Sequence, residues 1–467
     1  MKNGKFWTRR DFIAKPAVCL AASQLLTRSN FLFADTITST PPATVTAALA
    51  NHSKIITRTM GRTGISMPIV SMGATGIGAE GIVRRAFEAG VRHFDTAAEY
   101  QEHQQEAMIG SVIKQMGVRQ QVVLATKVLT GDMRKNLTSA QAGQKMREIF
   151  EASLKSLQTD YVDILYMPQV DDIAELSLEG PLNTMVALKK EGKVRALGIS
   201  THQGEAVLNE VVRLGVHDVV LLVFNVSSGS DQGLLTAMER AHSKGVGIVA
   251  MKTSAGNMGG PGGGGGPRPS GGSAQGGGPG GPQQANGSGG PGQAGGQRPQ
   301  GGPGGPGGGS GGPGGEPGGQ QQSTGAARTA LLKWVLHHES VTTLISAFAS
   351  YDHIEQNVAV AYDLSYSEAE RKVLADKKLV ASLEFCHQCG QCRATCPYGA
   401  EIPTLMRAHM YALQYAPGTG FPRETLATIP AGRGLEACSN CASCKAACSR
   451  TVNIARKIAE LQNWAVG

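Results

Sequence analysis

Short apolar segments alternate with longer amphipathic segments between residues 54 and 365. The eight apolar segments are residues 69–74, 93–97, 122–128, 162–168, 194–200, 219–226, 247–253 and 342–348. They are rich in valine, isoleucine and leucine, as expected of strands that are buried on both faces. Amphipathic runs such as residues 79–90 and 142–158 lie between them and fit helices. Eight strands that alternate with helices predict parallel pairing and the α/β class, in the form of a (β/α)8 TIM barrel.

A segment rich in glycine, proline, glutamine and serine interrupts this pattern after the seventh strand. Of the 63 glycines, 33 lie in residues 259–320. Such a composition cannot bury enough apolar surface to offset the entropy of ordering, so residues 259–322 are predicted to be a disordered insertion. Loops that follow the strands of such a barrel lie on its catalytic face. The insertion could shield or tether something there, or be a passenger loop that the fold tolerates.

A cysteine-rich region follows the predicted barrel, and the spacing C-x2-C-x2-C-x3-C occurs in it twice. This is the run of bacterial ferredoxins, in which the fourth cysteine ligates the other cluster. The spacing therefore predicts two [4Fe–4S] clusters. One would be held by Cys386, Cys389, Cys392 and Cys448, and the other by Cys438, Cys441, Cys444 and Cys396.

Zinc and disulfides are the alternatives for these cysteines. Zinc sites generally use two separated pairs of ligands, and closely spaced triplets suit a metal better than disulfides. The ninth cysteine, Cys19, lies far upstream. A helical run at residues 401–416 separates the two cysteine runs and predicts a small α-helical ferredoxin-like domain at residues 385–467. A linking helix is expected at residues 366–384.

Three polar residues at or just beyond the ends of predicted strands suggest acid catalysis. They are Asp95, Tyr100 and Lys127, and strand ends converge on the catalytic face of such a barrel. A buried ammonium beside a phenol stabilises the phenolate, so Lys127 is expected to lower the pKa of Tyr100. Asp95 would hold the lysine charged. Tyr100 could then protonate a carbonyl oxygen while hydride arrives at the carbon.

The barrel region resembles the aldo-keto reductases. The matching motifs are HFDTAAEY (93–100), ATKV (125–128), LQTDYVDILY (157–166), GKVRALGIS (192–200) and ISAFASYDHIEQN (345–357). The resemblance implies a (β/α)8 barrel that transfers hydride between NAD(P)H and carbonyls or alcohols, with Asp95, Tyr100 and Lys127 as catalytic residues. The chain also resembles a sub-group of these barrels that carries a C-terminal ferredoxin-like extension.

One catalytic residue of the family does not carry over. It is a histidine, and the matching position holds Pro168, whose side chain offers no hydrogen bond. The neighbouring Gln169 is a possible substitute, and His202 is a more remote one. The loss puts ordinary aldehyde reduction in doubt, and a structural network in a degenerate barrel is the alternative reading of Asp95, Tyr100 and Lys127.

The resemblance also implies residues that bind the nicotinamide cofactor. Ser200 matches the residue that binds the carboxamide, and Gln356 and Asn357 match residues near the adenine. Lys252 ends the seventh strand and could approach the pyrophosphate. The supporting glutamine of the family is replaced by Leu221. The choice between NAD and NADP stays open.

The stretch WTRRDFIAK at residues 7–15 resembles the twin-arginine export signal. Residues 16–26 are mildly apolar but too short and too polar to span a bilayer. Residues 1–34 are therefore expected to be a cleaved signal, residues 35–53 a linker, and the mature protein periplasmic with no stable membrane span. The alternative is a cytoplasmic tail with a chance arginine pair.

These features together predict an exported iron–sulfur oxidoreductase that acts on a small carbonyl or alcohol and exchanges electrons with a redox partner protein. The alternatives are an electron-transfer protein with a degenerate ligand-binding barrel, and a barrel braced by structural clusters. Free nicotinamide is expected to be scarce outside the cytoplasm, which favours a retained cofactor. The net charge is +8, but basic residues are spread along the chain, so nucleic acid is not an expected partner.

Overall fold

The computed structural model describes residues 54–75, 77, 79–100, 103–254, 318–348, 350–376, 386–415, 420–450 and 452–466. The expected export signal, the linker at residues 35–53 and most of the expected insertion lie outside the described residues. The barrel and the cysteine-rich domain belong to one compact unit. None of the helices in the described ranges has the length and apolar character needed to cross a membrane.

Eight parallel strands close into a barrel in the order β10-β3-β4-β5-β6-β7-β8-β9. Their bounds are Val70–Gly73 (β3), His93–Asp95 (β4), Val123–Lys127 (β5), Val162–Met167 (β6), Val194–Thr201 (β7), Val219–Val223 (β8), Gly247–Met251 (β9) and Thr343–Ala347 (β10). Seven of these strands lie within the predicted segments, and β7 extends one residue beyond its segment, to Thr201. The prediction of a (β/α)8 barrel is confirmed.

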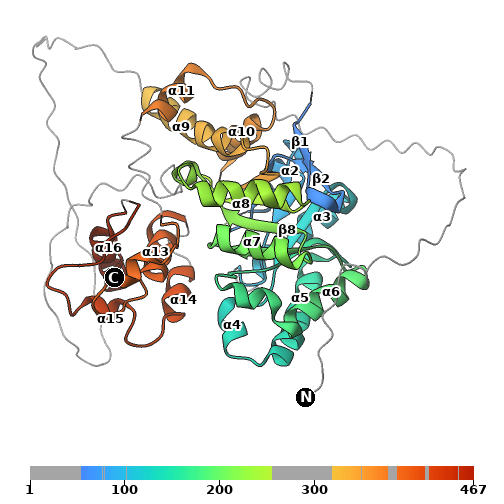
Figure 1. Ribbon diagram of the computed structural model, residues 1–467. Coiled ribbons are helices and arrows are strands. Elements are labelled where there is room, and N and C mark those ends of the chain that lie inside the picture. Colours follow the sequence, from blue (N-terminus) through green and yellow to red (C-terminus); the bar gives the residue numbers. More distant parts are fainter. Residues whose placement is uncertain are drawn as a thin grey trace, which may run out of the picture. The chain divides into compact units, whose positions relative to one another are not determined.

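Helices pack around the barrel, and each of them except the five-residue helix Gly131–Lys135 contributes to the apolar core (Figure 1). They are α2 (Glu80–Glu88), α3 (Gln104–Met116), α4 (Gly131–Lys135), α5 (Ser139–Leu157), α6 (Glu179–Lys190), α7 (Gly204–Leu214), α8 (Gln232–Ser243), α9 (Gly318–Leu336) and α10 (Tyr351–Val360). Helix α5 begins where it does because Thr138 and Gln141 form a reciprocal capping box. Helix α9 begins at Gly318, before the expected end of the insertion at residue 322. After the two glycines that open the helix, the glutamines at 320–322 are good helix formers.

A short hairpin precedes the barrel and has no counterpart in the predicted elements. Strands β1 (Thr57–Thr59) and β2 (Ser66–Pro68) pair antiparallel, and they are too short for periodicity to reveal them. Met60, Ile65 and Met67 from this hairpin join the apolar cluster inside the barrel. A Cβ on Gly247, the first residue of β9, would clash with Met60, so the hairpin closes the end at which the strands begin. The opposite end is left for the site.

The cysteine-rich domain consists of short helices, drawn in red in Figure 1. They are η6 (Gln391–Thr395), α13 (Ile402–Met410), η7 (Tyr411–Tyr415), α14 (Phe421–Ala427), α15 (Leu435–Cys438) and α16 (Ile454–Val466). The helix expected at residues 401–416 is present as α13, which continues into the π-helical turn η7. Helix α11 (Glu368–Ala375) occupies part of the expected linking segment. Residues 377–385 lie outside the described ranges.

Candidate active site and cluster sites

Asp95 and Lys127 meet at the ends of neighbouring strands. Asp95 ends β4 and Lys127 ends β5, and the parallel pairing of these strands brings the two side chains together. The Lys127 ammonium forms an ion pair with the Asp95 carboxylate and donates to the backbone carbonyl of Thr96 at 2.8 Å. Its Nζ lies 5.4 Å from the centroid of the Tyr100 ring. The three predicted catalytic residues are thus brought together.

The electrostatics of this group differ from the expectation for the tyrosine. Burial opposes the charge on Lys127, but Asp95 and Tyr100 outweigh it and raise the lysine's pKa, so the ammonium is retained. Burial also raises the pKa of Tyr100, and Lys127 offsets only part of this effect because Asp95 and Glu99 act against it. The expected net lowering of the Tyr100 pKa is wrong, because the pKa is raised. Tyr100 stays protonated and can act as an acid.

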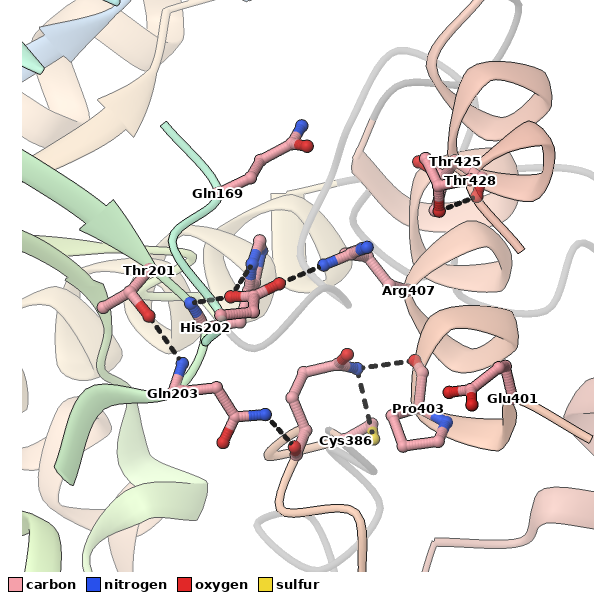
Figure 2. A network of polar contacts seen from close by, with 12 residues as sticks. Gln169, Thr201, His202, Gln203, Cys386, Glu401, Pro403, Arg407, Thr425 and Thr428 are labelled. Carbon is pink, nitrogen blue, oxygen red and sulfur yellow. Dashed lines mark hydrogen bonds and ion pairs between the residues drawn. The ribbon is translucent and has the colours of Figure 1, made fainter. Parts of the chain in front are cut away.

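A cavity of about 620 Å³ opens beside these residues. Its barrel side includes Tyr100, Lys127, Pro168, Gln169, Ser200, Leu221 and His202. The other wall belongs to the cysteine-rich domain and consists of Arg407, Tyr411, Glu424, Thr425 and Thr428. Figure 2 shows Arg407 reaching from α13 toward His202, with Gln169 and Thr425 nearby. Sequence reasoning missed this wall, because no motif marks Arg407 or Tyr411.

The cavity also contains the substitutes considered for the missing histidine. Pro168 lines the cavity, and the adjacent Gln169 does so in a left-handed backbone conformation, with φ at 55°. His202 lies across the cavity with its Nε2 2.7 Å from Nζ of Lys252. Burial lowers the pKa of His202 to about 4, and the Lys252 charge acts in the same direction. His202 is therefore neutral near pH 7.

The structure separates the residues expected to bind nicotinamide. Ser200 is the second-last residue of β7, lines the cavity and is only 6% exposed, which fits a hydroxyl that holds a carboxamide. Gln356 and Asn357 lie on α10 and do not line the cavity. The Asn357 amide instead bonds Arg328 and the carbonyl of Ala347, each at 3.1 Å. Of this set, Ser200 is the residue whose side chain reaches the cavity.

Lys252 also differs from its expected setting. Its amino group lies between His202 and the Tyr411 hydroxyl, and Nζ is 3.3 Å from the Tyr411 oxygen. Burial lowers the pKa of Lys252 well below its ordinary value, and the nearby Arg407 charge lowers it further. A phosphate site would instead require a lysine that remains charged.

The cysteines fall into the two sets that their spacing predicts. Cys386, Cys389, Cys392 and Cys448 line one small cavity. The thiol of Cys438 is influenced most by Cys444, Cys396 and Cys441 among its sulfur neighbours. Within the described ranges, no three His, Cys, Asp or Glu side chains meet at the spacing of a single metal ion.

The surroundings of the thiols fit iron–sulfur ligands. The Gln388 side chain donates to Sγ of Cys386 at 3.4 Å, and the backbone N–H of Arg450 donates to Sγ of Cys448 at 3.3 Å. Hydrogen bonds to the ligand sulfurs are among the features that set cluster potentials. Burial raises the pKa of Cys386 to about 12 and that of Cys438 to about 11, so the thiolates need a metal to form at neutral pH.

Two protein-family models match this chain, one in the barrel and one in the cysteine-rich domain. Residues 78–259 match the model of the aldo/keto reductase family, and residues 385–453 match that of the 4Fe-4S dicluster domain. The chain carries an aldo/keto reductase domain followed by a 4Fe-4S dicluster domain. Its reductase domain is the barrel, and its dicluster domain contains both cysteine runs.

Curated relatives align with part of the reductase domain. L-galactose dehydrogenase of Arabidopsis thaliana is 29% identical over 212 residues, which are 42% of this chain and 65% of that protein. Aldo-keto reductase YhdN of Bacillus subtilis is 37% identical over 119 residues, 25% of this chain and 35% of that protein. The chain thus spans less than two thirds of the length of either relative. Aldo-keto reductase AKR11C1 from Bacillus halodurans, in its holo form, superposes with a TM-score of 0.48 at 18% identity, covering 70% of this chain and 96% of that one.

The dicluster domain contacts the reductase domain at the ends of barrel strands. Arg407 forms an ion pair with Asp171 at 2.6 Å, and Asp171 also accepts from the backbone N–H of His202 at 3.0 Å. Burial opposes the charge on Asp171, but His202 and Arg407 hold its pKa well below its usual range.

Two further contacts involve residues beside the first set of cysteines. Gln203 donates to the backbone carbonyl of Gln388, and Arg450 pairs with Asp231 at 2.8 Å. Gln388 and Arg450 are the residues whose N–H groups reach the sulfurs of Cys386 and Cys448. The cysteine set at Cys386 therefore lies against the reductase domain.

Proposed function

We propose that this protein is an iron–sulfur oxidoreductase. Its barrel transfers hydride between a bound nicotinamide and a carbonyl or alcohol substrate, and two [4Fe–4S] clusters carry electrons between the barrel and a redox partner protein. One observation carries the proposal: the acid group of Tyr100 and Lys127 shares its cavity with side chains of the dicluster domain. A volume of about 620 Å³ is within the range of small-molecule sites.

The residues of the barrel have separate roles in this proposal. A nicotinamide, held at its carboxamide by Ser200, would supply or accept the hydride. Tyr100 gives its phenolic proton to the substrate oxygen. The Lys127 ammonium stabilises the phenolate that remains, and Asp95 keeps the lysine charged and in place. In the oxidative direction, the phenolate takes the proton back from the alcohol.

The two cysteine sets match the number of electrons that the proposed reaction exchanges. Oxidation of an alcohol to a carbonyl releases two electrons and two protons, and two [4Fe–4S] clusters held by these cysteines would each take one of the electrons. The set at Cys386 is the nearer one in this proposal because Gln388 links it to the strand end that holds Ser200. The set at Cys438 would pass electrons to the partner.

Export belongs to the proposal as well. The pair Arg9 and Arg10 favours the twin-arginine pathway, which suits a protein whose metal ligation is coupled to folding. Outside the cytoplasm, where free nicotinamide is scarce, the cofactor would stay bound and be recharged through the clusters, whereas NADPH added to the purified protein can reduce the site directly. A fusion of residues 1–40 to a reporter tests the leader. A reporter that stays in the cytoplasm would contradict export.

Lys127→Met tests the hydride step directly. The variant removes the charge that stabilises the phenolate, and we expect turnover of 4-nitrobenzaldehyde with NADPH to fall by at least about 10³-fold. The visible and electron paramagnetic resonance spectra of the clusters should not change. The matched control is Lys145→Met, because Lys145 is a half-exposed lysine on the outer surface of α5. Full turnover by Lys127→Met would exclude the assigned role.

A second candidate is an electron-transfer protein whose barrel is a degenerate scaffold. Pro168 and Leu221 favour it, since both replace hydrogen-bonding residues of the family inside the cavity. The two candidates differ in what reduces the clusters. Linked oxidation of nicotinamide and reduction of the clusters supports the first, and reduction by a protein donor without nicotinamide supports the second.

A further inference from the structure

Pro168 leaves one side of the cavity without the hydrogen-bond donor that the family resemblance places there. A carbonyl oxygen that gains negative charge is best stabilised by more than one preorganised donor. Tyr100 supplies one donor, and the proline side chain supplies none. The question is which other residue near this cavity is held in place to act as the second.

Tyr411 of the dicluster domain lines the same cavity as Tyr100 and Pro168. It is the first residue of η7, a π-helical turn into which α13 continues. Such turns are rare and are often found at functional sites. A charge on Tyr100 would raise the pKa of Tyr411, so the two phenols lie within electrostatic reach of each other.

Lys252 holds the Tyr411 hydroxyl from the barrel side. Its Nζ lies 3.3 Å from the phenolic oxygen and 4.7 Å from the ring centroid. The same Nζ contacts Nε2 of His202 at 2.7 Å, and His202 in turn lies against Asp171. Lys252 adopts a left-handed φ of 56°, a conformation that costs a lysine free energy and is often retained where function needs it.

Lys252 is the donor in its contact with the Tyr411 hydroxyl. A phenol that accepts one hydrogen bond keeps the capacity to donate another. The contact with His202 holds the lysine, and the lysine in turn holds the phenol. A restrained donor contributes more than a mobile one because no reorganisation is needed when charge develops.

We propose that Tyr411 donates a second hydrogen bond to the substrate oxygen, and that Lys252 and His202 position it. The inference rests on the proposed function, because it concerns the same substrate oxygen. No bond forms or breaks at Tyr411, and the transferred proton still comes from Tyr100. The reductase site is then complete only when the dicluster domain is in place, which makes that domain part of the active site as well as an electron carrier.

Tyr411→Phe tests the proposal in the full chain with both clusters, purified without oxygen. With 4-nitrobenzaldehyde and NADPH as probes, we expect kcat to fall about 10²-fold while KM changes little, because the lost interaction forms as charge develops. Lys252→Met should lower kcat in the same way, by less. Tyr398→Phe is the matched control, since Tyr398 is a tyrosine of the same domain with 48% exposure. Gln169→Leu removes the competing donor in the cavity and should have the smaller effect.

A rescue variant separates a donor role from a structural one. Pro168→His, placed in the Tyr411→Phe background, restores a donor from the barrel side and should recover part of kcat. Iron content and the visible spectrum are measured for each variant, and they should match those of the unaltered chain. A variant that loses its iron and is not rescued by Pro168→His would show that Tyr411 is structural and overturn the proposal.

The remaining outcomes distinguish this inference from the proposed function. If Tyr411→Phe keeps full kcat while Tyr100→Phe loses it, the inference fails and the proposed function stands. A larger loss in Gln169→Leu than in Tyr411→Phe would assign the second donor to Gln169 and also overturn the inference. Full activity in Tyr100→Phe, or no turnover by the unaltered chain, would overturn both.

Discussion

The barrel and the dicluster domain build their cores by different means. The barrel buries aliphatic side chains on both faces of a closed sheet, with Leu124, Leu165 and Val220 among those that have no solvent exposure. The dicluster core is small, and cysteines pack among its few aliphatic side chains, as Cys392 does beside Leu405. A closed sheet pairs its own backbone groups, whereas a small set of short helices has too little apolar area to fold without further support. One wall of the cavity thus comes from a domain with a large apolar core, and the other comes from a domain whose folding we expect to depend on metal.

Removal of the clusters is expected to have the largest effect and to divide the two domains. Anaerobic chelation should abolish hydrogen-exchange protection in α13 and α16, because metal binding supplies much of the folding free energy of a small metal-bound domain. Protection in β5 to β8 should persist. Cys392→Ala should behave in the same way for the first cluster, with Ser439→Ala as its control. Equal loss of protection in both domains would contradict the comparison.

Acid should weaken the barrel through a histidine far from the cavity. His217 has no solvent exposure, and burial lowers its pKa to about 4 from an ordinary 6.5. Between these values, the unfolded chain binds a proton that the folded chain does not. Above pH 6.5, His217 is neutral in both states and does not lower the free energy of unfolding. As the pH falls from 6.5 toward 4, the free energy of unfolding decreases by up to about 3 kcal/mol.

Urea unfolding of the barrel between pH 4.5 and 7 measures this effect. His217→Gln should flatten the dependence of the free energy of unfolding on pH. His242→Gln is the control, since His242 is an exposed histidine in the last turn of α8. An unchanged slope in His217→Gln would show that other groups are responsible.

The smallest expected effect lies at the link between the domains. Gln388→Leu removes the N–H that Gln388 donates to Sγ of Cys386, and this bond favours the reduced, more negative cluster. We expect the potential of one cluster to fall by roughly 50 mV, since a hydrogen bond contributes about 1 kcal/mol and 59 mV is tenfold for one electron. Gln203→Leu, which acts from the barrel, should shift it less.

Gln391→Leu provides the control for this measurement. Gln391 belongs to the same cysteine run, but its side chain accepts from Ser449 and is exposed. Its replacement should leave both potentials unchanged. If the cluster potentials do not respond to Gln388→Leu, this contact joins the barrel to the dicluster domain without affecting the cluster potential.

The sequence by itself determined the parts of this protein that depend on local pattern. The run Val219–Val223 is apolar throughout because both faces of a barrel strand are buried, so it can be identified without knowledge of its neighbours. Asp95 and Lys127 could be paired in advance because strand ends of a barrel converge. The cysteine spacing indicated iron–sulfur ligation because few other chemistries need three thiols so close together.

Tertiary structure decided what the cavity contains. Arg407 meets Asp171 across 236 positions of sequence, and Tyr411 meets Lys252 across 159, so no local pattern could have indicated either contact. In the sequence, the Lys127 charge alone predicts a lowered pKa for Tyr100, but burial and the nearby carboxylates raise this pKa. Interactions set by docking and desolvation depend on the whole fold. The sequence could identify a reductase barrel and a cluster domain, but only the folded chain shows that side chains of both line one cavity.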